Sequence, residues 1–163
     1  MLLSKLPAHS RIWFFGAQRL LSEIEIQKLE ETLKIFVGQW KAHGAQLSAD
    51  FEILHEAILI VGVDESVAPP TGCSIDKVFQ LLKDFHVETG ADFFQRTLIW
   101  EAFCNSSEIY SIDEAKIALS QGRLKDNTLI VNSLIQSLEA ARESIYIPLN
   151  ASWAAPKLGL KLN

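Results

Sequence analysis

The sequence LSADFEILHEAILIVGV, residues 47–63, decides the fold of this chain. Apolar and polar side chains alternate over residues 47–56, which predicts a strand with one buried face and one polar face, and the alternation places His55 on the inward side. A tight turn leads to Ile58–Val63, whose continuous apolar side chains predict a central strand that ends at Asp64 and Glu65. The short connection makes these two strands antiparallel neighbours.

The segment before this hairpin predicts a strand and then an amphipathic helix. Arg11–Phe15 (RIWFF) is rich in aromatic and β-branched side chains, as short strands are. Ser22 and Glu25 have the spacing of a capping box, so a helix is expected to begin there, and apolar side chains follow at helical spacing. We expect this helix to end at Gly44, with His43 in its last turn.

The segment after the hairpin predicts a second helix and a fourth strand. Pro69–Gly72 excludes regular structure, a helix is expected from about Ser74 to Thr89, and Thr97–Cys104 (TLIWEAFC) is expected to be a strand. The order β-α-β-β-α-β matches the split unit of ferredoxin-like folds. Right-handed crossovers then give an antiparallel sheet of strand order 4-1-3-2, with both helices on one face.

The remainder of the chain predicts a smaller α/β extension. Ser111 and Glu114 form another capping box, which opens a short helix. The apolar spacing of Thr128–Ile135 suits either a strand or the start of a helix, and we favour a strand followed by a short helix. The sequence therefore predicts one α+β domain over residues 1–163, with a core at about 11–104 and a C-terminal extension at about 105–163.

Composition and charge exclude several classes of protein. The chain is 48% hydrophobic and 21% charged, as globular domains are, and its net charge of −5 repels phosphate, so neither nucleic acid nor an anionic membrane is expected as a partner. Its longest apolar run, Ala57–Val63, is far shorter than a membrane span, and its start has no signal-peptide pattern. The two cysteines, Cys73 and Cys104, lack the spacing of a disulfide scaffold. We therefore expect reduced thiols and a cytoplasmic location.

Known cofactor motifs are missing from the sequence. It contains no phosphate-binding G-x-x-x-x-G-K-[ST] loop and no G-x-G-x-x-G, H-E-x-x-H, G-x-S-x-G or C-x-x-C pattern, so no cofactor is expected. A metal site made from His43, Cys73 and a carboxylate would match no standard zinc spacing, so no metal site is predicted either.

The predicted topology brings reactive residues together at one end of the sheet. The end of the first helix, the end of the third strand and the start of the second helix share that end. The residues expected there are Trp40, His43, Asp64, Glu65, Gly72, Cys73, Ser74 and Asp76. Arg11 and Cys104 are expected nearby, whereas Arg19 and Arg96 are expected at the opposite end.

Two kinds of site are consistent with that cluster. Free N–H groups at a helix start favour negative charge, so the turn Gly72-Cys73-Ser74, with Trp40 and Asp76 beside it, predicts a binding site for a small anion. The alternative is a thiol-dependent enzyme with Cys73 as nucleophile, His43 as base, and Asp64 or Glu65 as the acid that orients the base. We favour the anion site, because it requires only the geometry of the turn.

A third hypothesis and several plain structural interpretations compete with these sites. Split β-α-β folds leave sheet edges and faces open, so a protein-interaction or homodimer module is the third hypothesis. Cys73 is also explained as a small buried residue at a helix start with Ser74 as its cap, and His43 as a helix-end residue. Trp40 is most simply a core residue.

The sequence also resembles a protein family. The strings Trp40–Gly44 (WKAHG), Val63–Ser66 (VDES) and Gly72–Asp76 (GCSID) are similar to an uncharacterised family of small bacterial cytosolic proteins, over nearly the whole chain from Leu6 to Trp153. Members of this family are often labelled "ABC transporter ATPase". The chain lacks the phosphate loop that such an ATPase needs, so we do not expect ATPase activity. The resemblance points to the Cys73 end of the domain and implies no mechanism.

Overall fold

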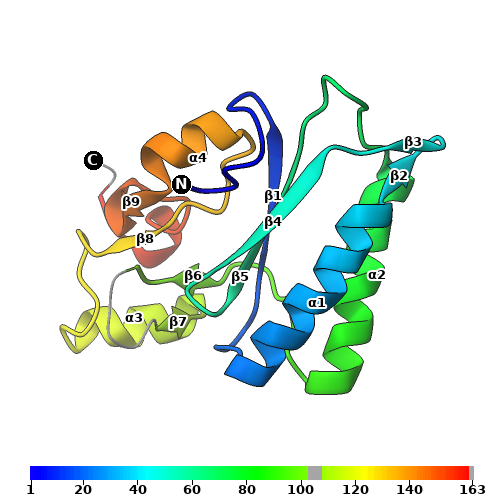
Figure 1. Ribbon diagram of the computed structural model, residues 1–163. Coiled ribbons are helices and arrows are strands. Elements are labelled where there is room, and N and C mark those ends of the chain that lie inside the picture. Colours follow the sequence, from blue (N-terminus) through cyan, green and yellow to red (C-terminus); the bar gives the residue numbers. More distant parts are fainter. Residues whose placement is uncertain (103–107, 162–163) are drawn as a thin grey trace. The chain divides into compact units, whose positions relative to one another are not determined.

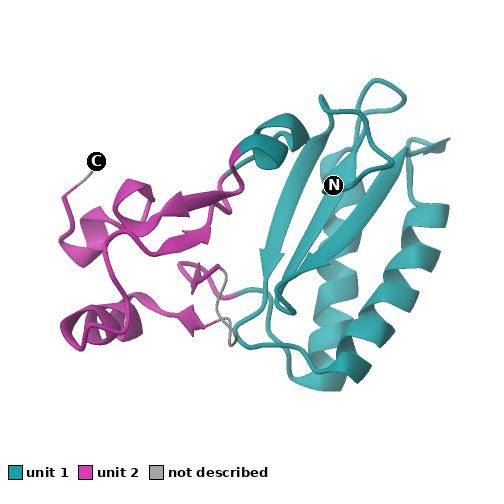
Figure 2. Ribbon diagram, turned by 60° about the vertical axis from the view of Figure 1, so that its left-hand side comes forward, with its two compact units in different colours: residues 1–94, 135–143 teal, residues 95–134, 144–163 magenta. Residues whose placement is uncertain are grey.

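A computed structural model describes residues 1–102 and 108–161 of the chain, and Figure 1 shows its helices and strands. The fold is α+β, with small antiparallel sheets. The chain forms two compact units, which Figure 2 shows in different colours. Unit 1 contains residues 1–94 and 135–143, and unit 2 contains residues 95–134 and 144–163. Cys104, which the sequence analysis placed at the end of a strand, lies outside the described residues.

Unit 1 is built on a three-stranded antiparallel sheet. Its strands are β1 (Arg11–Gly16), β4 (Ala49–Leu54) and β5 (Ile58–Val63), in the order β1-β5-β4. All six residues of β5 are buried, which confirms the central strand expected from its apolar run. His55 and Glu56 have φ of 50° and 56° and form the turn between β4 and β5, so His55 does not belong to the strand as predicted.

Helices α1 (Glu23–Gln39) and α2 (Gly72–Thr89) lie side by side against one face of this sheet (Figure 1). Ser22 and Glu25 form the predicted capping box at the start of α1. The core between the helices and the sheet contains fully buried side chains from both helices and from the central strand. Among them are Leu29 and Leu33 of α1, Val78 and Leu82 of α2, and Leu59, Val61 and Val63 of β5.

The predicted end of the first helix is wrong. Helix α1 ends at Gln39, and the chain continues into a hairpin of β2 (Lys41–Ala42) and β3 (Ala45–Gln46). His43 and Gly44, with φ of 49° and 82°, make the two-residue turn of this hairpin. A glycine with positive φ occurs both at helix ends and in hairpin turns, so Gly44 alone does not distinguish a helix end from a hairpin. The pairing of β2 with β3 on either side of the turn does.

The predicted fourth strand forms in part, but its predicted pairing is wrong. Strand β6 covers only Ile99–Trp100 and pairs with β7 (Ile109–Tyr110) in unit 2, not with β1. At the outer edge of β1, the Ile12 N–H donates to Gln136 O (2.9 Å), and Arg11 bridges to Ser137. This segment contacts β1 at the edge expected for strand four, and the order 4-1-3-2 does not form. The ferredoxin-like arrangement is therefore not confirmed.

The other face of the sheet in unit 1 is covered by the N-terminal segment and helix α4 (Leu138–Ser144). The Arg142 guanidinium donates to three backbone carbonyls of this segment, those of Leu2, Leu3 and Leu6, at 2.9 to 3.0 Å. Leu3 and Leu6 pack so closely over Gly62 that an added Cβ would lie 2.7 Å from each of them. Any larger residue at position 62 would therefore require the side chains of Leu3 and Leu6 to move.

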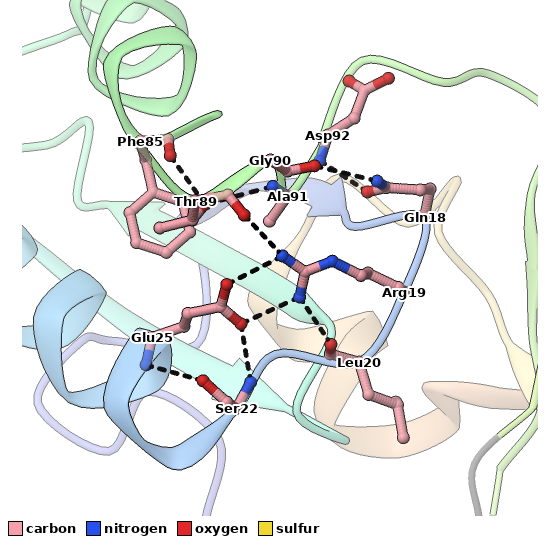
Figure 3. Close-up of polar contacts among 10 residues, drawn as sticks. All are labelled: Gln18, Arg19, Leu20, Ser22, Glu25, Phe85, Thr89, Gly90, Ala91 and Asp92. Carbon is pink, nitrogen blue, oxygen red and sulfur yellow. Dashed lines mark hydrogen bonds and ion pairs between the residues drawn. The ribbon is translucent and has the colours of Figure 1, made fainter. Parts of the chain in front are cut away.

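The far end of the helix pair is closed by a network around Arg19, as Figure 3 shows. Arg19 donates to both carboxylate oxygens of Glu25 at 2.8 and 2.9 Å, and also to Thr89 O at the end of α2. Gln18 donates to Gly90 O and accepts from the Asp92 N–H. These contacts join the start of α1 to the end of α2 and confirm that Arg19 lies away from the Cys73 end.

Unit 2 contains helix α3 (Ile112–Ser120) and a pair of strands, β8 (Leu129–Val131) and β9 (Tyr146–Pro148). The capping box at Ser111, the strand after residue 128 and the short helix that follows are all confirmed. The Tyr110 hydroxyl hydrogen-bonds to the carboxylates of Glu101 and Glu108. Burial, together with these carboxylates, raises the pKa of Tyr110 above its ordinary value.

Candidate functional site

The ends of the two long helices meet, as the topology predicted. Trp40 follows the last turn of α1 and is 1% exposed. Its indole N–H donates to the backbone oxygen of Ser74 in the first turn of α2, at 2.9 Å. Its ring also lies 5.1 Å from that of Phe36, centroid to centroid. Trp40 therefore joins the two helix ends inside the core, and its N–H is not available to a ligand.

Thr71 caps helix α2, whereas the sequence analysis assigned the cap to Ser74. The Thr71 side chain accepts from the Ser74 N–H (3.2 Å), and the Ser74 hydroxyl accepts from the Thr71 N–H (2.6 Å) and donates to Thr71 O (2.8 Å). The helix consequently begins at Gly72, two residues earlier than expected. Ser74 is buried, and its polar groups are used by the cap.

Gly72 and Cys73 are the exposed part of this helix start. Cys73 is a free, exposed thiol, so the interpretation of Cys73 as a small buried residue is wrong. Across the part of the chain that the structure describes, no acceptor is found for the backbone N–H of Gly72 or Cys73. Asp76 is also exposed, in the next turn of the same helix.

The predicted catalytic residues do not contact one another as a triad. His43 is exposed at the tip of the β2-β3 hairpin. Asp64 instead accepts hydrogen bonds from the Ser66 hydroxyl (2.6 Å) and the Ser66 N–H (3.0 Å), and its Oδ1 lies 3.0 Å from His9 Nε2. Between Cys73, His43 and Asp64, all within the described range 1–102, there is no hydrogen bond or ion pair.

Asp64 is held as a carboxylate by these neighbours. The Ser66 hydroxyl, followed by the Ser66 N–H and His9, keeps the pKa of Asp64 below its ordinary value. The Ser66 hydroxyl donates its hydrogen to the Asp64 carboxylate and not to the His9 imidazole. His9 therefore cannot remove the hydroxyl proton as a general base in this arrangement. The neighbouring Glu65 forms an ion pair with Arg11 at 3.6 Å.

Sequence reasoning missed His9, although strand register contains a signal for it. Arg11 is paired with Val63 in the antiparallel β1-β5 ladder. Residues just before Arg11 must therefore lie opposite residues just after Val63, which places His9 near Asp64. Within residues 1–102 and 108–161, no three His, Cys, Asp or Glu side chains are grouped closely enough to hold a metal ion.

Sequence reasoning also missed a groove between α1 and α2. This helix-pair groove has a volume of about 410 Å³. Its apolar lining comes from Phe36, Leu81 and Phe85. Its polar lining comes from Lys28, Thr32, Lys77, Gln80, Asp84 and Glu88. Lys28 and Glu88 form an ion pair across the two helices at one end of the groove.

Exposed apolar side chains flank the helix-pair groove. Ile24 and Ile35 on α1 are 79% and 64% exposed, and Val87 on α2 is 83% exposed. Ile24 precedes the groove residue Lys28 by one helical turn, and Val87 follows Asp84 by about one turn. The sequence pattern does not indicate these exposed positions, because a 3.6-residue period does not distinguish a wide buried stripe from a stripe with an open edge.

Comparisons of this chain with protein-family models, curated proteins and solved structures gave no match. The family resemblance therefore stays a prediction, and function has to be inferred from the geometry. None of the helices that the structure describes is long and apolar enough to cross a membrane.

Proposed function

We propose that this chain is a protein-binding module that acts through the outer side of the α1-α2 pair. The observation that carries the proposal is the helix-pair groove, about 410 Å³ in volume, with Phe36, Leu81 and Phe85 in its lining. Concave apolar surfaces with a few polar groups around them are typical binding sites. A helix or loop of a partner that filled the groove would remove this apolar surface from water.

The flanks of the groove support the same function. A single exposed aliphatic side chain needs no explanation, but Ile24, Ile35 and Val87 each lie within one helical turn of a residue that lines the groove. Covering a side chain of this size stabilises a complex by about 1.5–3 kcal/mol before the costs of association. The polar groups around the groove would then set the orientation of the partner.

The contacts around Cys73 favour binding over catalysis. A thiol nucleophile needs a base within hydrogen-bond reach and a group that orients the base. His43 is not placed to act as that base, because it lies at the tip of an exposed hairpin. Asp64 is not available to orient it, because Asp64 already contacts His9 and Ser66. The thiol-dependent enzyme is therefore the weaker of the hypotheses.

The module is tested with a photo-crosslinking amino acid, p-benzoylphenylalanine, placed at Ile35 in cells that produce the protein. We expect adducts from position 35 and none above background from Ile117, an exposed position (53%) on α3 of unit 2. Thr32 is exposed and lines the groove, so Thr32→Arg should block the groove and remove the adducts, while Thr32→Ala should keep them. Equal adducts in both Thr32 variants would overturn the proposal.

A small anion held at the start of α2 is the second candidate function. The supporting observation is that Gly72 and Cys73 are both exposed at the start of an 18-residue helix, beyond the reach of the Thr71 cap. Two such N–H groups and the helix dipole favour negative charge. Trp40 and Ser74, which the sequence analysis included in this site, would support the helix ends and not contact the anion.

Gly72 offers a clean test of the anion site. Proline is favoured at the first position of a helix and lacks an N–H, and the extended Thr71 (φ −108°, ψ 167°) tolerates a following proline. No atom lies within 4 Å of a Cβ added at Gly72, so Gly72→Ala is a control that keeps the N–H. Titration with inorganic phosphate, followed by the Cys73 amide NMR signal, should show weaker binding for Gly72→Pro than for Gly72→Ala. Equal affinity in the two variants, or no response in the unmodified protein, would contradict the anion site.

A cytoplasmic setting belongs to the same proposal. Cys73 is exposed and free. Exposed thiols persist in reducing compartments and are readily oxidised elsewhere.

A further inference from the structure

We infer that the partner on the helix-pair groove is a second copy of this chain, related by a two-fold axis that crosses α2 near Gln80 and Leu81. The inference rests on the proposed function and adds the identity of the partner. Its evidence is the distribution of charge along the groove, which is opposite in sign at the two ends of α2.

The groove has one basic and one acidic end along α2. Lys77 lies toward the start of α2, and Asp84 and Glu88 lie toward its end. Glu88 is already neutralised by Lys28 of the same chain, whereas Asp84 accepts only a neutral hydrogen bond, from Gln80 (2.9 Å). Lys77 forms no ion pair with any residue of the described range. The groove therefore presents one unpaired cation and one unpaired anion.

A two-fold rotation matches these charges to each other. With a rise of about 1.5 Å per residue, Lys77 and Asp84 each lie roughly 5 Å along α2 from the point midway between them, at residues 80–81. An axis through that point exchanges the two ends of the helix, so Lys77 of each copy faces Asp84 of the other. Such an isologous contact forms two identical ion pairs and closes the assembly at two copies.

The apolar side chains are suited to the same contact. The axis position puts Leu81 at the centre of the interface, and the exposed Ile35 and Val87 extend the apolar area on α1 and α2. Helices of 17 and 18 residues, packed about 10 Å apart, present a face of roughly 25 by 20 Å. A face of this size belongs to the smaller class of interfaces, so we expect a dimer that forms at micromolar or higher concentrations.

The charges determine the register of the dimer more than its strength. Exposed ion pairs contribute little each, and the net charge of −5 on each copy opposes association slightly. Reversing one charge has a larger effect than removing it, because two like-charge contacts replace two ion pairs. This makes a charge exchange the most informative test.

The test is sedimentation velocity of the full chain and its variants, from micromolar to millimolar concentration. The unmodified protein should dimerise, and Lys77→Glu and Asp84→Lys should each weaken the dimer by about tenfold or more, since two contacts change at once. The double variant Lys77→Glu with Asp84→Lys should recover most of the affinity. Lys83→Glu, on the same helix but outside the groove, is the matched control and should dimerise normally.

The outcomes separate this inference from the proposed function. Finding only monomer at every concentration would overturn the second copy as the partner. A double variant that dimerises no more tightly than the single variants would overturn it as well. If position 35 still crosslinks to another protein in a manner blocked by Thr32→Arg, the protein-binding function remains and only the partner is wrong. If the crosslinks are absent as well, both fail. Circular dichroism of each variant, recorded beside these measurements, distinguishes lost association from lost folding.

Discussion

Replacing Trp40 with alanine is expected to lower the free energy of unfolding by about 3–5 kcal/mol, the usual cost of removing a buried aromatic side chain. Trp40 is 1% exposed and packs against Phe36 in the core of unit 1. It is also the residue whose indole joins the end of α1 to Ser74 at the start of α2. The substitution therefore leaves a cavity and removes the bond between the two helix ends.

Trp40→Phe separates these two effects. Phenylalanine keeps most of the buried volume but removes the indole N–H that donates to the Ser74 backbone oxygen, and losing this one hydrogen bond should cost about 0.5–1.5 kcal/mol. Urea unfolding followed by circular dichroism measures both variants, with Gln39→Ala, an exposed neighbour, as the control. A loss below about 1 kcal/mol for Trp40→Ala would mean that the helix ends are not packed as described.

Acid is expected to weaken the protein through Glu25. Arg19, followed by the Ser22 N–H, lowers the pKa of Glu25 from 4.5 to about 2. A carboxylate whose pKa is lower in the folded state stabilises the fold above the pKa of the unfolded state. This stabilisation is present above about pH 4.5 and is lost as the pH falls toward 2. Because Arg19 is 40% exposed, solvent screening reduces the effect, and we expect about 1–2 kcal/mol.

Glu25→Gln isolates this contribution. The variant should be less stable than the unmodified protein at neutral pH, and the difference should shrink below about pH 4.5 and become small near pH 2, where about half of the unmodified Glu25 is protonated in the folded state. Glu23→Gln, in the same first turn of α1 but outside the Arg19 network, should follow the unmodified protein through this range. Denaturant unfolding at a series of pH values provides the comparison. If the free energy of unfolding of Glu25→Gln ran parallel to that of the unmodified protein down to about pH 2, the acid sensitivity could not be assigned to Glu25.

Local signals predicted most of the elements correctly. The capping boxes at Ser22 and Ser111 end in glutamate, the pattern that the sequence rule describes, and both helices begin where expected. The box at Thr71 ends in Ser74, whose hydroxyl replaces the carboxylate, so the rule did not recognise it. The start of α2 was consequently placed two residues too late.

Long-range pairing explains the larger errors. The segment 97–104 has the composition of a strand, and nothing local indicates that β6 would pair with β7 and not with β1. Residues 136 and 137 are far away in sequence and carry no strand signal, yet they occupy the edge of β1. Propensity predicts that a segment is extended, whereas its partner is decided by the packing of the whole unit.

The candidate site was predictable only in part, for the same reason. Chain direction through the sheet was enough to place Trp40 beside Ser74. It could not show that both residues would be used in capping and packing, or that His9 and not His43 would reach Asp64. The helix-pair groove depends on how closely two helices pack, and helical periodicity does not contain that distance.

The contacts of Arg142 have a consequence for how this protein is made. Leu2, Leu3 and Leu6 leave the ribosome long before Arg142, which is up to 140 positions later in the chain. Unit 1 also needs residues 135–143, which are synthesised after much of unit 2. The first 94 residues therefore cannot complete their packing until residues 135–143 have been made, so the contacts of Arg142 with the N-terminal segment form late.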